Sequence, residues 1–348
     1  MPLTLPANQP PRFYRGGPRI AALRAIKTGD DHLPEDHVPE DHLPEDWVGS
    51  TTSTFGTDRE GLSTLADGRL LRAAVAADPE AFLGRGHVER FGCDPRLLVK
   101  LLDAGERLPV HLHPGRAFAR RHLGSEYGKT EAWVIVSAEP GARVHVGFRH
   151  DVAAKALRDW VTRNDAEALL GALHEVPVSA GDALLVPAGT AHAIGEGILL
   201  VELQEPTDFS ILLEQPAADD LQPELGLGWE VALHAVDRAG VSEPQLQALA
   251  GSPRRLHPGA STLLPEVAAP YFRAERIEPD PVAELDPGFS VLIVLEGDGR
   301  LSATAGERGL ARGDTVLIPH AAGRVQLYGE LVAVRCRPPD PAAGVPPW

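Results

Sequence analysis

The sequence predicts a mainly β protein with two jelly-roll barrels and an added helical segment. Its 348 residues include 35 Gly and 32 Pro but only 9 Phe and 4 Tyr, which indicates many turns between short strands. From residue 97 onward, short apolar runs alternate with Gly, Pro and Asp turns. The pattern at residues 180–187, a Gly-Asp turn followed by an apolar strand and a proline, returns at residues 312–319. We therefore expect the barrel to occur twice.

Residues 1–96 are expected to form an N-terminal arm and helical elements that pack on the first barrel. Leu71, Ala74 and Val75 follow helical spacing. Pro79 suits the first turn of a second helix.

A five-residue unit, Asp-His-Leu/Val-Pro-Glu, is repeated three times over residues 31–46. The proline in each unit interrupts both helices and β-ladders. One interpretation is a metal-binding tract formed by His32, His37 and His42. We favour a duplicated acidic surface loop, because nothing fixes the three imidazoles in one geometry.

The first barrel is expected over residues 97–215. A helical interlude is predicted at about 152–173, where Leu157, Trp160 and Val161 recur at helical spacing. The predicted strands, each bounded by turn residues, are 97–102, 108–113, 132–136, 142–146, 175–178, 183–187 and 197–202.

A helical linker is expected over residues 216–262, followed by the second barrel over residues 263–348. In the second barrel Arg324 stands at the position that matches His192, and no residue matches Glu131. We therefore expect the second barrel to be structural and to bind no metal.

The net charge of −16 argues against a nucleic-acid surface, because the phosphates would be repelled. A local basic pocket could still bind a phosphorylated substrate. Only Cys93 and Cys336 are present, so no disulfide framework is expected. Residues 1–17 lack the apolar core of a signal peptide or membrane anchor. These observations predict a cytoplasmic protein with no nucleic-acid or membrane partner.

Four residues, His111, His113, Glu131 and His192, predict one metal site. Histidines at i and i+2 on a strand point to the same face. A carboxylate 18 residues after His113 and a third imidazole complete a shell of three nitrogens and one oxygen. That shell suits Zn, Mn, Fe or Ni. The alternative is a buried strand with satisfied histidines, which a lone His-x-His would favour.

These residues stand inside a longer pattern. Its segments are Lys100, 108–114, 128–133 (Gly-Lys-Thr-Glu-Ala-Trp), 181–195 and 202–208, with N-terminal elements at 14–17 and 45–50. The pattern, concentrated in residues 97–210 or about a third of the chain, resembles that of the type I phosphomannose isomerases (mannose-6-phosphate isomerases) of the cupin superfamily. The resemblance implies two cupin barrels and a metal-dependent aldose–ketose isomerase. Its implied reaction interconverts mannose and fructose, or their 6-phosphates, through an enediolate. Zn is the first implied cofactor, with Mn, Fe or Ni as alternatives, and the implied partner is a small-molecule sugar or sugar phosphate.

Four further residues are candidates for catalysis under this resemblance. Lys129 lies two residues before the predicted carboxylate ligand and can point at a substrate, with a turn lysine as the alternative. Lys100 lies in an apolar strand, where it has either a function or a rim position with its ammonium group in water. Glu202 and Asp208 are candidates for the proton shuttle, with loop capping as the alternative.

Two positions depart from the family pattern. His111 replaces the family's glutamine ligand, and Leu212 replaces an arginine four residues after Asp208. Without that fixed cation, we expect free sugars to be tolerated better than is usual in the family. Other cations could replace the missing arginine, Lys100, Lys129 and Arg324 among them.

Two other classes of function remain open. A shell of three His and one Glu also serves dioxygenases, which use a redox-active metal and O2. The other is a non-catalytic sugar-binding cupin, which the departure at Leu212 favours. Oxygen consumption would indicate the first, and sugar binding without turnover would indicate the second.

Overall fold

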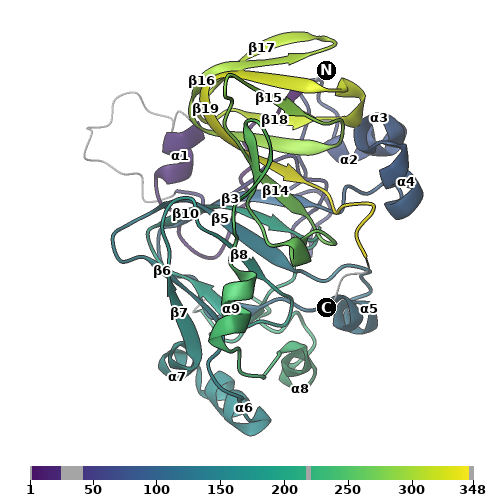
Figure 1. Cartoon of the computed structure of the whole chain (residues 1–348). Helices are drawn as coiled ribbons and strands as arrows, with labels where there is room; N and C mark the ends of the chain where they lie inside the picture. The colour runs from purple at the N-terminus through teal and green to yellow at the C-terminus, as the bar shows by residue number, and fades with distance from the viewer. Residues whose placement is uncertain (1, 25–41, 217–220, 345–348) are drawn as a thin grey trace, which may run out of the picture.

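Two antiparallel β bodies make up most of the protein, so the predicted mainly β fold is confirmed. The computed structural model describes residues 2–24, 42–216 and 221–344. In Figure 1 the teal first barrel lies below the green and yellow C-terminal body. Within the described ranges, no helix is both long and apolar enough to cross a membrane. Most of the repeat at 31–46, including His32 and His37, lies outside the described residues.

The first barrel consists of two five-stranded sheets whose inner faces pack on each other. Across the first sheet the strands are β2 (Glu45–Trp47), β3 (Leu98–Ala104), β10 (Ile198–Gln204), β5 (Glu131–Ala138) and β8 (Ala183–Val186). Across the second sheet they are β11 (Ile211–Leu212), β4 (His111–Leu112), β9 (His192–Ile194), β6 (Arg143–Phe148) and β7 (Leu173–Pro177).

Strand β10 is buried along its whole length because it separates two cores. Leu200 packs inside the first barrel. Leu199, Val201 and Leu203 face the other way and pack with residues of the C-terminal body. This two-sided burial explains why the strand reads as a continuous apolar run until Glu202, which points into the barrel with Leu200.

Helices cover the outer face of the second sheet and the far end of the first barrel (Figure 1). The predicted helical interlude forms two helices, because Asn164 ends the first in the left-handed region (φ 50°) and the Asp165 carboxylate caps the second. The helices after β4 are α5 (Arg116–His122), α6 (Ala154–Arg163), α7 (Ala166–Ala172), α8 (Trp229–Ala232), η1 (Leu233–Ala235) and α9 (Glu243–Leu249).

The C-terminal body is one nine-stranded sheet that also includes a strand of the N-terminal arm. Its apolar interior is formed largely by β15, β16, β18 and β19. Its elements are β1 (Leu3–Thr4), β12 (Arg254–His257), β13 (Ala260–Thr262), η2 (Glu266–Ala268), β14 (Arg273–Ile277), β15 (Val282–Leu285), β16 (Ser290–Ala303), β17 (Gly306–Ala311), β18 (Thr315–Ile318), η3 (His320–Ala322) and β19 (Val325–Arg337).

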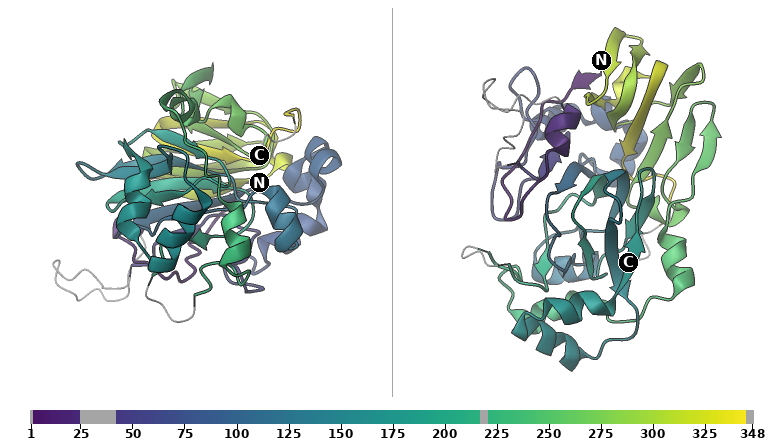
Figure 2. Two further views of the ribbon diagram at one scale, coloured as in Figure 1. Left: turned by 90° about the horizontal axis from the view of Figure 1, so that it is seen from below. Right: turned by 90° about the vertical axis from the view of Figure 1, so that its left-hand side faces the viewer.

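The N-terminal arm contacts both bodies, so the prediction that it packs on the first barrel was incomplete. Strand β1 pairs with β18 of the C-terminal sheet, whereas β2 pairs with β3 of the first barrel. Figure 2 (right) shows the purple segment running alongside both. Helix α3 packs against η3 of the C-terminal body. The helices of this region are α1 (Arg19–Arg24), α2 (Leu71–Ala77), α3 (Pro79–Leu83) and α4 (Arg85–Phe91).

The linker predicted over residues 216–262 is helical only in part. After α9, strands β12 and β13 join the edge of the C-terminal sheet through β14. Residues 254–262 form a hairpin that pairs with the edge strand β14, and this tertiary pairing overrides their weak local preference. The four-part division of the chain otherwise stays a prediction.

Candidate active site

Three imidazoles converge between the two sheets of the first barrel. His111 on β4 and His192 on β9 are directly paired across the second sheet. His113 follows two residues later and shares the face of His111. One ring nitrogen from each of the three lies within 4.8 Å of the others, and all three side chains are buried.

Hydrogen bonds fix the tautomer of each imidazole. The Nδ1 atoms of His111, His113 and His192 lie 2.8, 2.7 and 2.9 Å from backbone carbonyl oxygens. A carbonyl only accepts, so each Nδ1 carries the proton and each Nε2 presents a lone pair to the cluster. Metal-binding histidines are commonly held in this way.

Glu131 supplies oxygens to the same space. Its Oε2 lies 2.9 Å from Nε2 of His113, and its Oε1 lies 3.4 Å from Nε2 of His192. Trp133 donates its indole N–H to Oε1 at 2.9 Å. Oε2 of Glu131 and Nε2 of His192 are buried without a hydrogen-bond partner. The ammonium group of Lys129 approaches two of these acceptors, Nε2 of His113 and Oε2 of Glu131, but Nε2 of His192 has no such partner among the described residues. Three nitrogens with one oxygen suit a divalent transition metal.

The charge states of these ligands also suit a metal. Burial lowers the pKa of His111 well below its usual value and lowers that of His192. Burial, followed by the charge of Lys129, lowers the pKa of His113 to about 3. Burial alone would raise the pKa of Glu131, but the charge of Lys129 holds it well below its usual range. The site therefore offers neutral imidazoles and a carboxylate, the forms that bind metal ions.

Lys129 reaches the ligands, as its place in the sequence predicted. Its Nζ lies 2.9 Å from Nε2 of His113 and 3.1 Å from Oε2 of Glu131. It is also 3.9 Å from Oε1 of Glu202. Its ammonium group is therefore beside the predicted metal ligands and lies near a second carboxylate.

Lys100 is fully buried, so the alternative of a rim lysine with its ammonium group in water is wrong. It is paired across the sheet with Glu202, and its Nζ lies 3.4 Å from that carboxylate. Glu45 and Asp208 lie 3.5 and 3.9 Å from the same Nζ. The ring of Trp47 lies 4.8 Å away. The four predicted catalytic candidates therefore lie in one continuous array.

Comparison with known proteins identifies the family. The chain is 32% identical over 241 residues to the mannose-6-phosphate isomerase of Streptococcus mutans, covering 68% of this chain and 72% of that protein. This chain belongs to the mannose-6-phosphate isomerase family. ManA of Bacillus subtilis, another mannose-6-phosphate isomerase, is 31% identical over 243 residues, with 67% and 72% covered. No family model matches the chain.

Solved structures of the family share the fold. The crystal structure of mannose 6-phosphate isomerase from Bacillus subtilis superimposes with a TM-score of 0.75 over 97% of this chain and 99% of its own, at 22% identity. A putative mannosephosphate isomerase from Archaeoglobus fulgidus superimposes with a TM-score of 0.73 over 97% and 98%, at 21% identity. The predicted resemblance and the cupin-type fold are confirmed, and the chain is that of an aldose–ketose isomerase.

Sequence reasoning missed Arg12, which contacts the candidate shuttle residue Asp208. Its Nη1 and Nη2 lie 3.0 and 3.1 Å from the two carboxylate oxygens, a bidentate pair. Its Nε lies 3.4 Å from Glu45. Its position in the sequence was the available signal, because Arg12 lies two residues before the family-like N-terminal element at 14–17.

Glu45 is the second residue that sequence reasoning missed. It accepts hydrogen bonds from the Trp47 indole at 2.6 Å and from the Tyr14 hydroxyl. Burial alone would raise the pKa of Glu45, but Arg12 and then Lys100 lower it to about 2. It is therefore an ionised anchor for the two cations.

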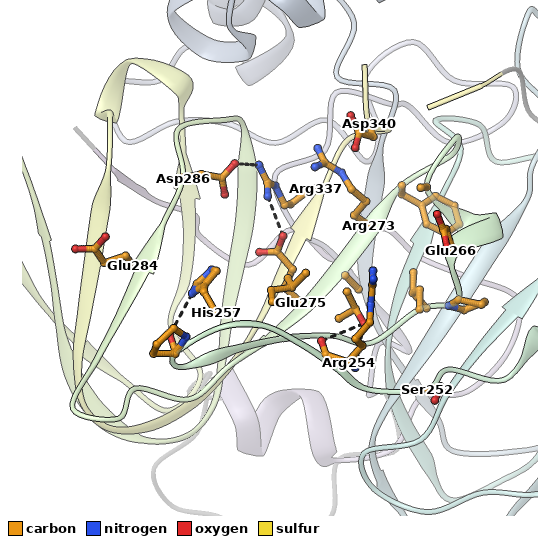
Figure 3. A pocket seen from close by; sticks show the side chains of 18 of the residues that line it. Ser252, Arg254, His257, Glu266, Arg273, Glu275, Glu284, Asp286, Arg337 and Asp340 are labelled. Carbon is orange, nitrogen blue, oxygen red and sulfur yellow. Dashed lines mark hydrogen bonds and ion pairs between the residues drawn. The ribbon is translucent and has the colours of Figure 1, made fainter. Parts of the chain in front are cut away.

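Arg324 does not reach this site, so it cannot compensate for Leu212. Its side chain is 75% exposed and lies 3.9 Å from Glu284. It lines a separate, larger cleft of about 1060 Å³ in the C-terminal body. In that cleft the carboxylates of Glu275 and Asp286 are bound by Arg337 (Figure 3). Cleft size is therefore a poor guide here, because His111 and Glu131, two of the predicted metal ligands, line the smaller pocket.

Proposed function

We propose that this protein interconverts mannose 6-phosphate and fructose 6-phosphate with a bound divalent metal. The observation that supports this best is the donor set of three neutral imidazoles and one carboxylate, with two buried lysines beside it. A dioxygenase needs the metal shell but has no use for the lysines and carboxylates that continue from it.

His111, His113, Glu131 and His192 would hold the metal ion. The ion supplies Lewis acidity that disperses negative charge on the carbonyl and adjacent hydroxyl oxygens of the sugar. We propose Zn as the native ion, because tetrahedral nitrogen and oxygen ligands suit it. Mn, Fe and Ni are the alternatives that metal analysis must exclude.

Glu202 is the group we propose to carry the proton between C2 and C1. It lies between Lys100 and Lys129, 3.4 and 3.9 Å away. Burial, and then the charge of Glu131, raise its pKa, which brings it toward the range useful for proton transfer. Arg12 and Lys100 outweigh the effect of burial on Asp208 and lower its pKa, so Asp208 is the weaker candidate.

The lysines would stabilise charge in this reaction. As the proton leaves C2, negative charge develops on the sugar oxygens. The ammonium group of Lys129 lies beside His113 and Glu131, two of the residues that would hold the metal. Lys100 keeps Glu202 oriented and balances its charge. Both groups are held before substrate arrives, which lowers the reorganisation needed in the transition state.

The test is turnover measured by NMR. Protein stripped of metal is reloaded with Zn, Mn, Fe or Ni under anaerobic conditions and mixed with mannose 6-phosphate. We expect fructose 6-phosphate to form with at least one ion and not with the stripped protein. Absence of turnover with every ion would overturn the proposal. Oxygen consumption would then indicate the dioxygenase, and calorimetric sugar binding alone would indicate the non-catalytic cupin.

We also propose a cytoplasmic location. It rests on the absence of a disulfide framework and on a phosphorylated substrate, which is typical of the cell interior. Cys336 is buried and Cys93 is exposed, and both are free thiols. Cell fractionation tests the location.

A further inference from the structure

The charged residues of the pocket alternate in sign from the metal ligands outward. Lys129 lies 3.9 Å from Glu202, and Glu202 lies 3.4 Å from Lys100. Lys100 lies 3.9 Å from Asp208, which accepts the bidentate contact of Arg12 at 3.0 Å. Along this series of contacts, Arg12 is separated from Lys129 by Glu202, Lys100 and Asp208.

Arg12 is also the most accessible of the three cations. Its side chain is 15% exposed, against 5% for Lys129 and 2% for Lys100. Only two of its five N–H bonds are needed for Asp208, so donors remain for another anion. A guanidinium group recognises phosphate by paired, parallel hydrogen bonds.

Arg12 supplies a cation near Leu212, the position at which the family pattern has an arginine. Both residues line the same pocket. Leu212 is paired with His111 in the second sheet, while Arg12 enters from the N-terminal arm, 196 residues before Asp208. A cation is thus present at this pocket, supplied by a different part of the chain.

We propose that Arg12 binds the phosphate group of the sugar phosphate and sets the preference for phosphorylated over free sugars. This inference rests on the proposed function. C1 and C2 of the sugar must lie at the metal ligands for isomerisation, so a phosphate on C6 extends toward the other end of the array. It also reverses the expectation, drawn from Leu212 alone, that free sugars are tolerated unusually well.

The experiment compares Arg12→Leu with Arg15→Leu, which removes the same charge three positions along the chain. Arg15 is 74% exposed and pairs with Glu106 outside the pocket. For Arg12→Leu we expect kcat/KM for mannose 6-phosphate to fall by about tenfold to hundredfold, the worth of one charge-assisted contact. For free mannose we expect a smaller fall, because Arg12 also pairs with Asp208, so the readout is the ratio of the two kcat/KM values. Arg15→Leu should match the parent with both substrates. The inhibition constant of inorganic phosphate should rise in Arg12→Leu only.

An equal fall for both substrates in Arg12→Leu would overturn the proposal, because it would mean that Arg12 only positions Asp208. A parent protein that prefers free mannose would overturn it as well. If Arg12→Leu fails to fold by circular dichroism, Arg12→Lys decides: it keeps the charge but loses the paired geometry. If kcat/KM of Arg12→Lys falls more for mannose 6-phosphate than for free mannose, the proposal is supported. If it falls equally for both substrates, the proposal is overturned.

Failure of the proposed function would look different. In that case the parent protein turns over neither sugar with any metal. Calorimetry with inorganic phosphate then tests Arg12 alone, since parent and Arg15→Leu should bind phosphate and Arg12→Leu should not. Equal binding by all three would overturn the assignment.

Discussion

The same turn starts corresponding strands in the two barrels. Gly181 and Gly313 have φ values of 92° and 88°, which favour glycine. The following residues, Asp182 and Asp314, accept hydrogen bonds from the backbone N–H three residues earlier at 2.8 and 3.0 Å. The local sequence thus forms the same turn in both barrels, but one barrel interior contains charged residues and the other is mainly apolar.

The first barrel has buried charges where the C-terminal body has an apolar core. Lys100 and Glu202 point into the first barrel, whereas interior positions of the C-terminal body are occupied by residues such as Leu292, Val294 and Leu327. Arg335 is a buried charge of the C-terminal body, and its guanidinium has carboxylate and hydroxyl partners.

Both bodies contain buried polar atoms without a hydrogen-bond partner, and Nε of Arg337 is one in the C-terminal body, but in the first barrel such atoms gather at one site. Oε2 of Glu131, Nε2 of His192 and Oε1 of Glu202 have no hydrogen-bond partner, although each is buried. Such atoms destabilise a fold unless a ligand satisfies them. The buried charges of the C-terminal body pair with one another, whereas the unpartnered atoms of the first barrel lie around the predicted metal site.

The largest effect on activity is expected from His192, the predicted metal ligand whose matching position in the C-terminal body is Arg324. His192→Ala should remove the metal and lower kcat/KM by roughly 10⁴-fold, because Lewis-acid stabilisation is worth several kcal/mol. Metal content by mass spectrometry and turnover by NMR check this. Arg324→Ala, at the matching position of the C-terminal body, should change neither. Full metal content in His192→Ala would remove this histidine from the ligand set.

Glu202→Gln should lower kcat by roughly 10³-fold with little change in metal content, because an amide cannot carry the proton. Asp208→Asn is the comparison, and its kcat should fall less. The two variants are measured at saturating sugar phosphate. A larger loss in Asp208→Asn would transfer the shuttle role to that residue.

Lys100→Met and Arg335→Met each remove a buried cation from one barrel. Both should lower the free energy of unfolding by about 3–5 kcal/mol, because carboxylates lose a buried partner. Urea unfolding measures this. Only Lys100→Met should also abolish turnover in the protein that remains folded. Loss of kcat in folded Arg335→Met would mean that the C-terminal charges take part in the reaction.

Acid should weaken the first barrel through Glu45. Its pKa of about 2 in the folded protein lies below the unfolded value, so its contribution is full above the unfolded pKa and is lost as pH falls toward 2. Between pH 5 and 3 this should cost roughly 1–2 kcal/mol of unfolding free energy. Glu45→Gln should be less stable at pH 7 but should show a shallower decline. An unchanged slope would assign the acid sensitivity to other carboxylates.

The sequence by itself determined the strands, the repeated turn and the candidate metal ligands. These depend on local rules: the period of two in a strand places His111 and His113 on one face, and Gly-Asp turns mark strand starts. Glu131 and His192 were predicted from their own strand and turn contexts, and the resemblance to the family implied the same residues.

Only the tertiary structure decided where the remaining charges meet. Arg12 contacts Asp208 across 196 residues, and Glu45 joins them from a third segment. No local period relates positions so far apart, because their meeting depends on how the arm crosses the barrel. Arg324, which matches His192 in sequence, lies at the surface: its side chain is 75% exposed, and its ion-pair partner Glu284 is 55% exposed.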